Sequence, residues 1–128
     1  MQIFSELWLK RFQERVNADA EMQVIGDWFT TAFSLSSEDA RCIVRFQRGQ
    51  LTDYIIAPRL DVRCAFGFRT TRDVWMRFFS QQPEPLYHDF FAMLMRVPGF
   101  VLEGDTLVAM QNARALHRAM NIMKTVAV

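Results

Sequence analysis

The chain is poor in glycine, proline and cysteine, and it has no long apolar run. Its 128 residues include 5 Gly, 4 Pro and 2 Cys. Such a composition excludes a collagen-like repeat, a Pro- and Gly-rich disordered chain and a small scaffold held by several disulfides. The densest apolar run, 90–95, is only six residues long, whereas a membrane-spanning helix needs roughly 18 or more. No transmembrane segment is therefore expected.

An excess of charge of one sign is also lacking. With 15 basic and 14 acidic residues the formal net charge is +1, which argues against a dedicated nucleic-acid-binding protein. Glu6, Lys10 and Arg11 interrupt the N-terminal segment where a secretory signal needs an apolar core. The last four residues match neither a peroxisomal nor a lipidation signal. We expect a cytoplasmic protein with one domain spanning residues 1–128.

Large, soft apolar side chains are abundant instead. The chain holds 12 Phe and 8 Met, and 51% of its residues are hydrophobic. A well-filled core accounts for most such residues. Methionine also adapts to irregular spaces and to varied ligands, so an apolar cavity for a flexible ligand is the sharper alternative.

Apolar periodicity predicts the order of the elements. A period near 3.6 indicates a helix over residues 3–16 and a short second helix that stops at Gly26. Alternation then indicates strands over 29–35, 42–46, 51–57 and 62–68, with a hairpin at 48–50. Thr70 and Asp73 have capping-box spacing before a helix that contains 74–79. A helix over 86–96, a strand over 100–102 and a long helix capped by Asp105 follow.

This order predicts an α+β fold. We expect a roughly five-stranded, mainly antiparallel sheet, because most connections between the strands are short. The helices should cover one face of it, since strands and helices are segregated along the chain.

The second half carries a recognisable succession of features. An apolar strand with Cys64, Phe66 and Phe68 precedes the Thr70-x-x-Asp73 helix start, Val74 and Trp75. The apolar segment 90–95, the Pro98-Gly99 bend, a short strand, the step Glu103-Gly104-Asp105 and an apolar-striped helix follow. In these features the chain resembles the sterol carrier protein 2 (SCP2-type) lipid-binding domain family.

The resemblance implies a tunnel between the sheet and the helices that holds a lipid, a fatty acid, an acyl-CoA or a sterol-like molecule. Its expected lining residues come from the fourth strand and the helices after it: Phe66, Phe68, Trp75, Phe78, Phe79, Phe90, Met93, Leu94, Met120 and Met123. Ordinary core packing is the alternative for each of them. The resemblance implies no cofactor.

Catalytic and metal-binding chemistry is not indicated. Cys42 and Cys64 are expected on inward strand faces as reduced thiols, and no histidine lies near either of them in the sequence. His88 and His117 have no metal-ligand spacing. His117 is placed instead at the edge of the last apolar stripe, where it can contact a ligand head group. We therefore predict a protein that is not an enzyme.

The charges are distributed unevenly. Residues 1–40 hold 7 acidic and 3 basic residues, whereas 41–72 hold 7 Arg and 2 Asp. Arg41, Arg45, Arg63 and Arg69 are expected on the outer sheet face, where they can approach an anionic membrane surface transiently. The alternative is a solvated face whose arginines pair with nearby acids.

The functional prediction is a non-enzymatic carrier of a hydrophobic ligand, with no nucleic-acid partner. One alternative is an accessory protein that holds isoprenoid quinone intermediates for biosynthetic enzymes. Another is a ligand-free protein-interaction domain. A protein partner and a homodimer both remain open.

Overall fold

The computed structural model describes residues 2–59 and 62–126. Helices and strands follow one another along the chain in the segregated order expected for an α+β fold. In sequence the elements are α1 (Glu6–Ala18), α2 (Ala20–Ile25), β1 (Thr31–Ser36), β2 (Arg41–Gln47), β3 (Gln50–Ile56), β4 (Phe66–Arg69), α3 (Arg72–Phe79), α4 (Phe90–Arg96), β5 (Val101–Gly104), α5 (Thr106–Gln111) and α6 (Ala113–Met123).

The described strands form one sheet in the order β3-β2-β1-β4-β5. The β3–β2, β2–β1 and β4–β5 pairs are antiparallel, and the β1–β4 pair is parallel. Arg48 and Gly49 both have positive φ, as a tight hairpin between β2 and β3 requires. The predicted mainly antiparallel sheet in an α+β fold is confirmed.

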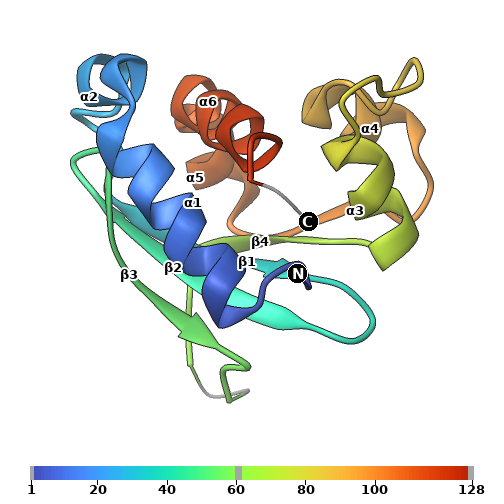
Figure 1. Cartoon of the computed structure of the whole chain (residues 1–128), viewed down its shortest axis with the longest axis horizontal. Helices are drawn as coiled ribbons and strands as arrows, with labels where there is room; N and C mark the ends of the chain where they lie inside the picture. Colours follow the sequence, from blue (N-terminus) through green and yellow to red (C-terminus); the bar gives the residue numbers. More distant parts are fainter. Residues whose placement is uncertain (1, 60–61, 127–128) are drawn as a thin grey trace.

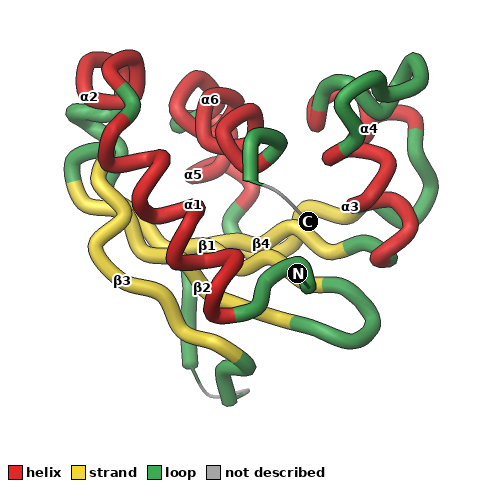
Figure 2. Tube along the Cα trace, viewed as in Figure 1, coloured by secondary structure: helices red, strands yellow, loops and turns green. Residues whose placement is uncertain are grey.

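The helices lie together on one side of the sheet (Figures 1 and 2). Alternation along the strands directs Phe33, Leu35, Val44, Phe66 and Phe68 into the core beneath them. Several of these rings are in contact: Phe33 and Phe66, paired across β1 and β4, are stacked with centroids 5.2 Å apart.

The other sheet face is closely packed where β1 meets β4. Ser34 and Gly67 are register partners, and both are buried. A Cβ atom on Gly67 would lie only 1.9 Å from Ser34 Oγ. A side chain at position 67 would force Ser34 to shift, so the close approach of the two strands favours glycine there.

Three sequence expectations need correction around β4. The strand is shorter than predicted and begins at Phe66, so Val62 and Cys64 lie in the segment before it. Cys64 is half-buried, and it does not occupy an inward strand position. The pairing of β4 with β1 is parallel because β4 follows a crossover connection and no hairpin.

Side-chain caps mark the starts of α3 and α5, with one shift from the prediction. Thr71, and not Thr70, caps α3: its Oγ1 accepts a hydrogen bond from the Val74 amide at 3.3 Å. Asp105 caps α5 as predicted and accepts a hydrogen bond from the Val108 amide at 3.1 Å. The predicted long final helix is divided at Asn112 into α5 and α6.

Candidate functional site

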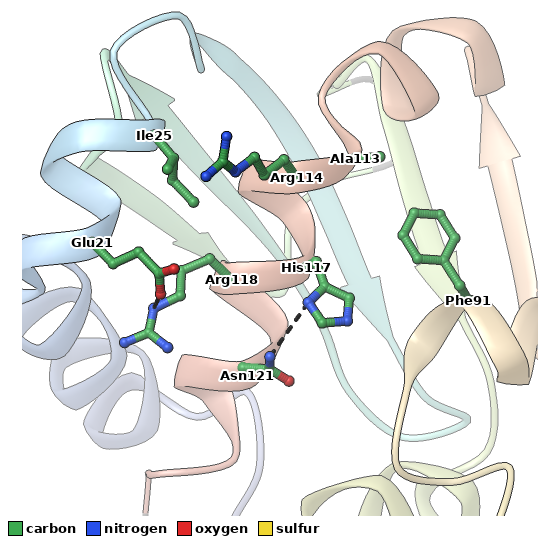
Figure 3. Close-up of a pocket in the computed structure, with 8 residues that line it drawn as sticks. All are labelled: Glu21, Ile25, Phe91, Ala113, Arg114, His117, Arg118 and Asn121. Carbon is green, nitrogen blue, oxygen red and sulfur yellow. Dashed lines mark hydrogen bonds and ion pairs between the residues drawn. The ribbon is translucent and has the colours of Figure 1, made fainter.

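An open cleft crosses the exposed side of α6, with α2 on one side and α4 on the other (Figure 3). Its volume is about 480 Å³. Its lining combines an apolar wall with a polar rim. The lining residues are Glu21, Ile25, Phe91, Ala113, Arg114, His117, Arg118 and Asn121.

The apolar wall connects the cleft with the core. Ile25 from α2, Ala113 from α6 and Phe91 from α4 supply its apolar surface. The Phe91 ring stacks on Phe90 with centroids 4.3 Å apart, and Phe90 is buried. Phe90 in turn contacts Phe68 edge-on at 5.7 Å. A continuous path of aromatic rings therefore leads from the cleft to the inner face of the sheet.

The rim on the α2 side is an ion-pair network. Arg118 Nε lies 2.9 Å from Asp19 Oδ2 and 2.9 Å from Glu21 Oε2. The hydrogen bond from Arg118 holds the pKa of Asp19 below its ordinary value, although burial opposes the shift. Arg114, one turn earlier on α6, makes no ion pair within the described part of the chain. Its guanidinium is therefore available to an anionic group in the cleft.

His117 lies at the centre of the rim and points toward Phe91 (Figure 3). Its Nε2 is 3.2 Å from Asp89 Oδ1, and its Nδ1 is 3.4 Å from Asn121 Nδ2. A neutral ring protonated at Nε2 satisfies both contacts, since Asp89 accepts a hydrogen bond and the Asn121 amide donates one. The Phe91 ring is nearly parallel to the imidazole, at 6.3 Å.

A second contact joins α6 to the segment that precedes α4. Lys124 Nζ donates a hydrogen bond to the His88 carbonyl oxygen at 2.6 Å and lies 4.4 Å from the centre of the Phe78 ring. Burial lowers the pKa of Lys124, while the nearby Asp89 charge opposes that shift. With His117–Asp89, this contact holds α4 against α6. We call these two contacts the α4 clamp.

The sequence-predicted tunnel residues lie together in the core beneath the cleft. All except Leu94 are buried members of one hydrophobic cluster, and Leu94 packs against that cluster while half-buried. Ring contacts join Phe66 to Phe68 and Trp75 to both Phe78 and Phe79. None of the ten lines the open cleft itself. Their contact with a ligand stays a prediction.

Arg41, Arg45 and Arg69 lie on strands of the sheet, but Arg63, contrary to the prediction, lies in the segment before β4. Two of the four arginines have acidic partners. Arg45 lies 3.4 Å from Asp53, and Arg69 lies 3.2 Å from Glu103. Arg63 is exposed, whereas Arg41 is half-buried. Pairing with nearby acids thus neutralises part of the expected basic surface.

The surroundings of Cys42 and of the other possible metal ligands do not indicate a reactive site among the described residues. Cys42 is buried, and burial raises the pKa of its thiol well above the ordinary range. No group of three or more His, Cys, Asp or Glu side chains arranged to hold a metal ion occurs among the described residues. None of the helices described is both long and apolar enough to cross a bilayer.

Sequence reasoning identified His117 but missed most of the cleft. The cleft is lined from α2 (Ile25), α4 (Phe91) and α6 (Arg114 and Asn121), so no local motif in the sequence marks it. The spacing of Arg114, Arg118 and Asn121 along α6 was an available signal, since residues three and four apart share a helix face.

Solved structures with the same fold include a crystal structure of sterol carrier protein 2. It superimposes with a TM-score of 0.80 at 14% identity, covering 98% of this chain and all of that one. The solution structure of a conserved hypothetical protein from Thermus thermophilus, described as possibly a sterol carrier protein, gives a TM-score of 0.74 at 16% identity and covers 99% and 91%. A structure described as the UbiJ-SCP2 ubiquinone synthesis protein gives 0.54 at 12% identity and covers 92% and 90%. The chain thus has the SCP2-type fold that its sequence features predicted.

No family model matches the sequence, and no curated protein matches it either.

Proposed function

We propose that this protein is a non-enzymatic carrier that shields a hydrophobic ligand from water. The observation that carries the proposal is the continuity between the cleft and the core: Phe91 in the cleft stacks on the buried Phe90, which contacts Phe68. The likeness of the fold to sterol carrier protein 2 supports the same conclusion.

The apolar part of the ligand would enter between α4 and α6 and occupy space among the predicted tunnel residues. Phenylalanine rings and methionine side chains there can rearrange around different ligands. Each buried CH₂ group contributes roughly 0.8 kcal/mol, so a ten-carbon chain would gain about 8 kcal/mol before the cost of association. Entry requires the α4 clamp to open, because its contacts cross the path.

The polar end of the ligand would remain at the cleft rim. Arg114 is available for ion pairing, and His117 and Asn121 supply hydrogen-bonding groups beside it. An amphipathic molecule with an anionic head group fits this combination. Ligand binding, and not catalysis, is the role proposed for His117. Asp89 is its carboxylate partner, but no cysteine nucleophile lines the cleft beside it. Cys42 is buried within β2.

A fluorescent fatty acid and its methyl ester test the proposal together. We expect the purified protein to bind the acid, and Phe91→Ala to weaken binding at least fivefold. Met95→Ala is the matched control, because Met95 is on the same helix but is 84% exposed and lies outside the cleft. A protein that binds neither probe would contradict the carrier function.

The acid and the ester separate the tail from the head group. We expect Arg114→Gln to weaken binding of the acid while leaving binding of the ester unchanged. Equal binding of both probes by the original protein would leave the carrier function standing and reject the anionic head group.

A role as an accessory protein that holds isoprenoid quinone intermediates is the second candidate. It is supported by the likeness to the structure described as a ubiquinone synthesis protein. Native mass spectrometry of the purified protein distinguishes the two: an isoprenoid quinone mass favours the accessory role, and a fatty acid mass favours the general carrier. Recovery of biosynthetic enzymes in a pull-down would favour the accessory role further.

A further inference from the structure

Two apolar side chains project into solvent where α2 ends. Trp28 is 89% exposed and Val24 is 76% exposed. The other two tryptophans, Trp8 and Trp75, are completely buried. We call Val24 and Trp28 the α2 tip. The helix α2 lies at the end of the molecule away from α3 and α4 (Figure 1).

Backbone hydrogen bonds on both sides of Trp28 hold the turn that carries it. The Gly26 amide donates to the Met22 carbonyl at 2.8 Å, and the Phe29 amide donates to the Gly26 carbonyl at 2.8 Å. Phe29 is buried, and its own carbonyl accepts a hydrogen bond from the Gly49 amide at 3.0 Å. The neighbours of Trp28 are thus fixed, and its exposure is a property of an ordered turn.

The charges around the α2 tip are balanced. Asp27 pairs with Arg48 at 2.9 Å, and Arg118 pairs with both Asp19 and Glu21. Arg114 completes a group of three acidic and three basic side chains. An anionic surface is therefore not repelled, and Arg114 contributes a positive charge free of any ion pair within the described residues.

The tip is also next to the cleft. Ile25 and Arg114 line the cleft, and both also line a small hollow of about 100 Å³ beside Trp28. A surface on which Trp28 rests would thus lie close to one end of the cleft.

From these observations we propose that the α2 tip docks into the interfacial layer of a phospholipid bilayer. Tryptophan favours that layer because its ring is apolar and its N–H remains able to hydrogen-bond. A protein partner fits less well: stable interfaces cover about 800 Å² on each side, whereas the tip offers two apolar side chains beside exposed polar residues, Gln23 and Asp27. The inference goes beyond the proposed function, since docking requires no ligand in the cleft.

Trp28 is itself the probe for the test, because the other tryptophans are buried. On addition of phosphatidylcholine vesicles we expect a blue shift of the emission and quenching by lipids brominated on their upper acyl carbons. Vesicles that also contain phosphatidylglycerol should bind about threefold more tightly than phosphatidylcholine vesicles, because Arg114 attracts the anionic lipid. Added salt should remove this difference.

Flotation with vesicles measures binding independently of fluorescence. We expect Trp28→Ser and Val24→Ser each to weaken binding, Trp28→Ser by at least tenfold. Met95→Ser, an equally exposed apolar position on α4, should bind like the original protein. Circular dichroism verifies that each variant is folded.

Two results would overturn the proposal. The first is an unchanged Trp28 emission together with no flotation on either vesicle type, which would leave a protein partner as the remaining role for the tip. The second is binding that survives Trp28→Ser and is lost in Arg45→Gln, which would place the membrane contact on the outer sheet face. Neither result affects fatty acid binding, so failure of docking and failure of the carrier function are distinguishable.

Discussion

Arg118 donates hydrogen bonds from two guanidinium nitrogens to the carboxylate of Asp19, although the two residues are 99 positions apart in the sequence. Its Nε lies 2.9 Å from Oδ2, and a terminal guanidinium nitrogen lies 2.5 Å from Oδ1. Asp19 is also the N-cap of α2 and accepts a hydrogen bond from the Met22 amide at 2.9 Å. This pair therefore fixes the start of α2 against the middle of α6.

Removing the guanidinium should lower stability in a pH-dependent way. We expect Arg118→Met to reduce the free energy of unfolding by about 1–2 kcal/mol at pH 7, a modest value because Arg118 is partly solvated. The pKa of Asp19 is lowered in the folded protein, so its contribution is present above the unfolded-state pKa and is lost as pH falls through the lowered one. Urea unfolding between pH 7 and pH 2.5 should show the difference between the two proteins shrinking in acid.

Arg114→Met is the control for this experiment. Arg114 lies one turn away on the same helix and has no ion pair within the described residues. Its replacement should change stability by less than about 0.5 kcal/mol at either pH. Equal effects of the two substitutions would contradict the role given to the Asp19–Arg118 pair.

The two buried tryptophans should differ in their tolerance of phenylalanine. Trp75 Nε1 donates to the Ser36 carbonyl at 2.9 Å, whereas Trp8 Nε1 has no hydrogen-bond partner among the described residues. Both substitutions remove the same atoms from the core. We expect Trp75→Phe to be more destabilising than Trp8→Phe by about 1–2 kcal/mol, measured by urea unfolding monitored with circular dichroism. The reverse order would show that the hydrogen bond contributes little.

Gly67→Ala should strain the seam between β1 and β4. The added methyl group meets Ser34 Oγ, and both residues are buried. We expect a loss of about 1–3 kcal/mol in the free energy of unfolding. Ser34→Ala removes the hydroxyl that the added methyl group would meet. The double variant, Ser34→Ala with Gly67→Ala, should therefore lose less free energy of unfolding than the sum of the two single losses. Additive losses would place the cause elsewhere.

The two cysteines should react at different rates. Cys42 is buried and burial raises its pKa, so both its access and its thiolate population are low. Cys64 is half-buried outside the strands. A disulfide reagent should label one thiol in the folded protein, and Cys64→Ser should abolish that phase. Rapid labelling of both thiols without denaturant would contradict the burial of Cys42.

Local chemistry made much of the fold predictable. Gly26 ends α2, Arg48-Gly49 forms the hairpin and Asp105 caps α5, each because the backbone at that point needs a particular residue type. The break at Asn112 was not predictable from periodicity, because α5 and α6 both bury apolar residues and the apolar pattern continues across the break. The parallel β1–β4 pairing depends on where a long connection passes, which strand alternation does not encode.

The candidate site was less predictable than the fold, because it depends on tertiary packing and not on local sequence. Aromatic and methionine residues identify an apolar interior, but they do not tell core packing from ligand contact. The cleft depends on how α2, α4 and α6 are placed, and Ile25, Phe91 and Arg114 meet there only through tertiary packing. His117 could be identified because helical spacing places it at the edge of the last apolar stripe.

The β1–β4 seam also bears on the order in which the domain assembles. The hairpin connecting β2 to β3 is short, whereas Phe33 pairs with Phe66 across more than thirty residues. Closing that longer loop loses more chain entropy before the β1–β4 contacts contribute any favourable free energy. We therefore expect the β1–β2–β3 meander to form early and β4 to join late, with the stacking of Phe33 on Phe66 completed in the same step. The slow event in folding would thus fall at the centre of the sheet, and its edge at β3 would form first.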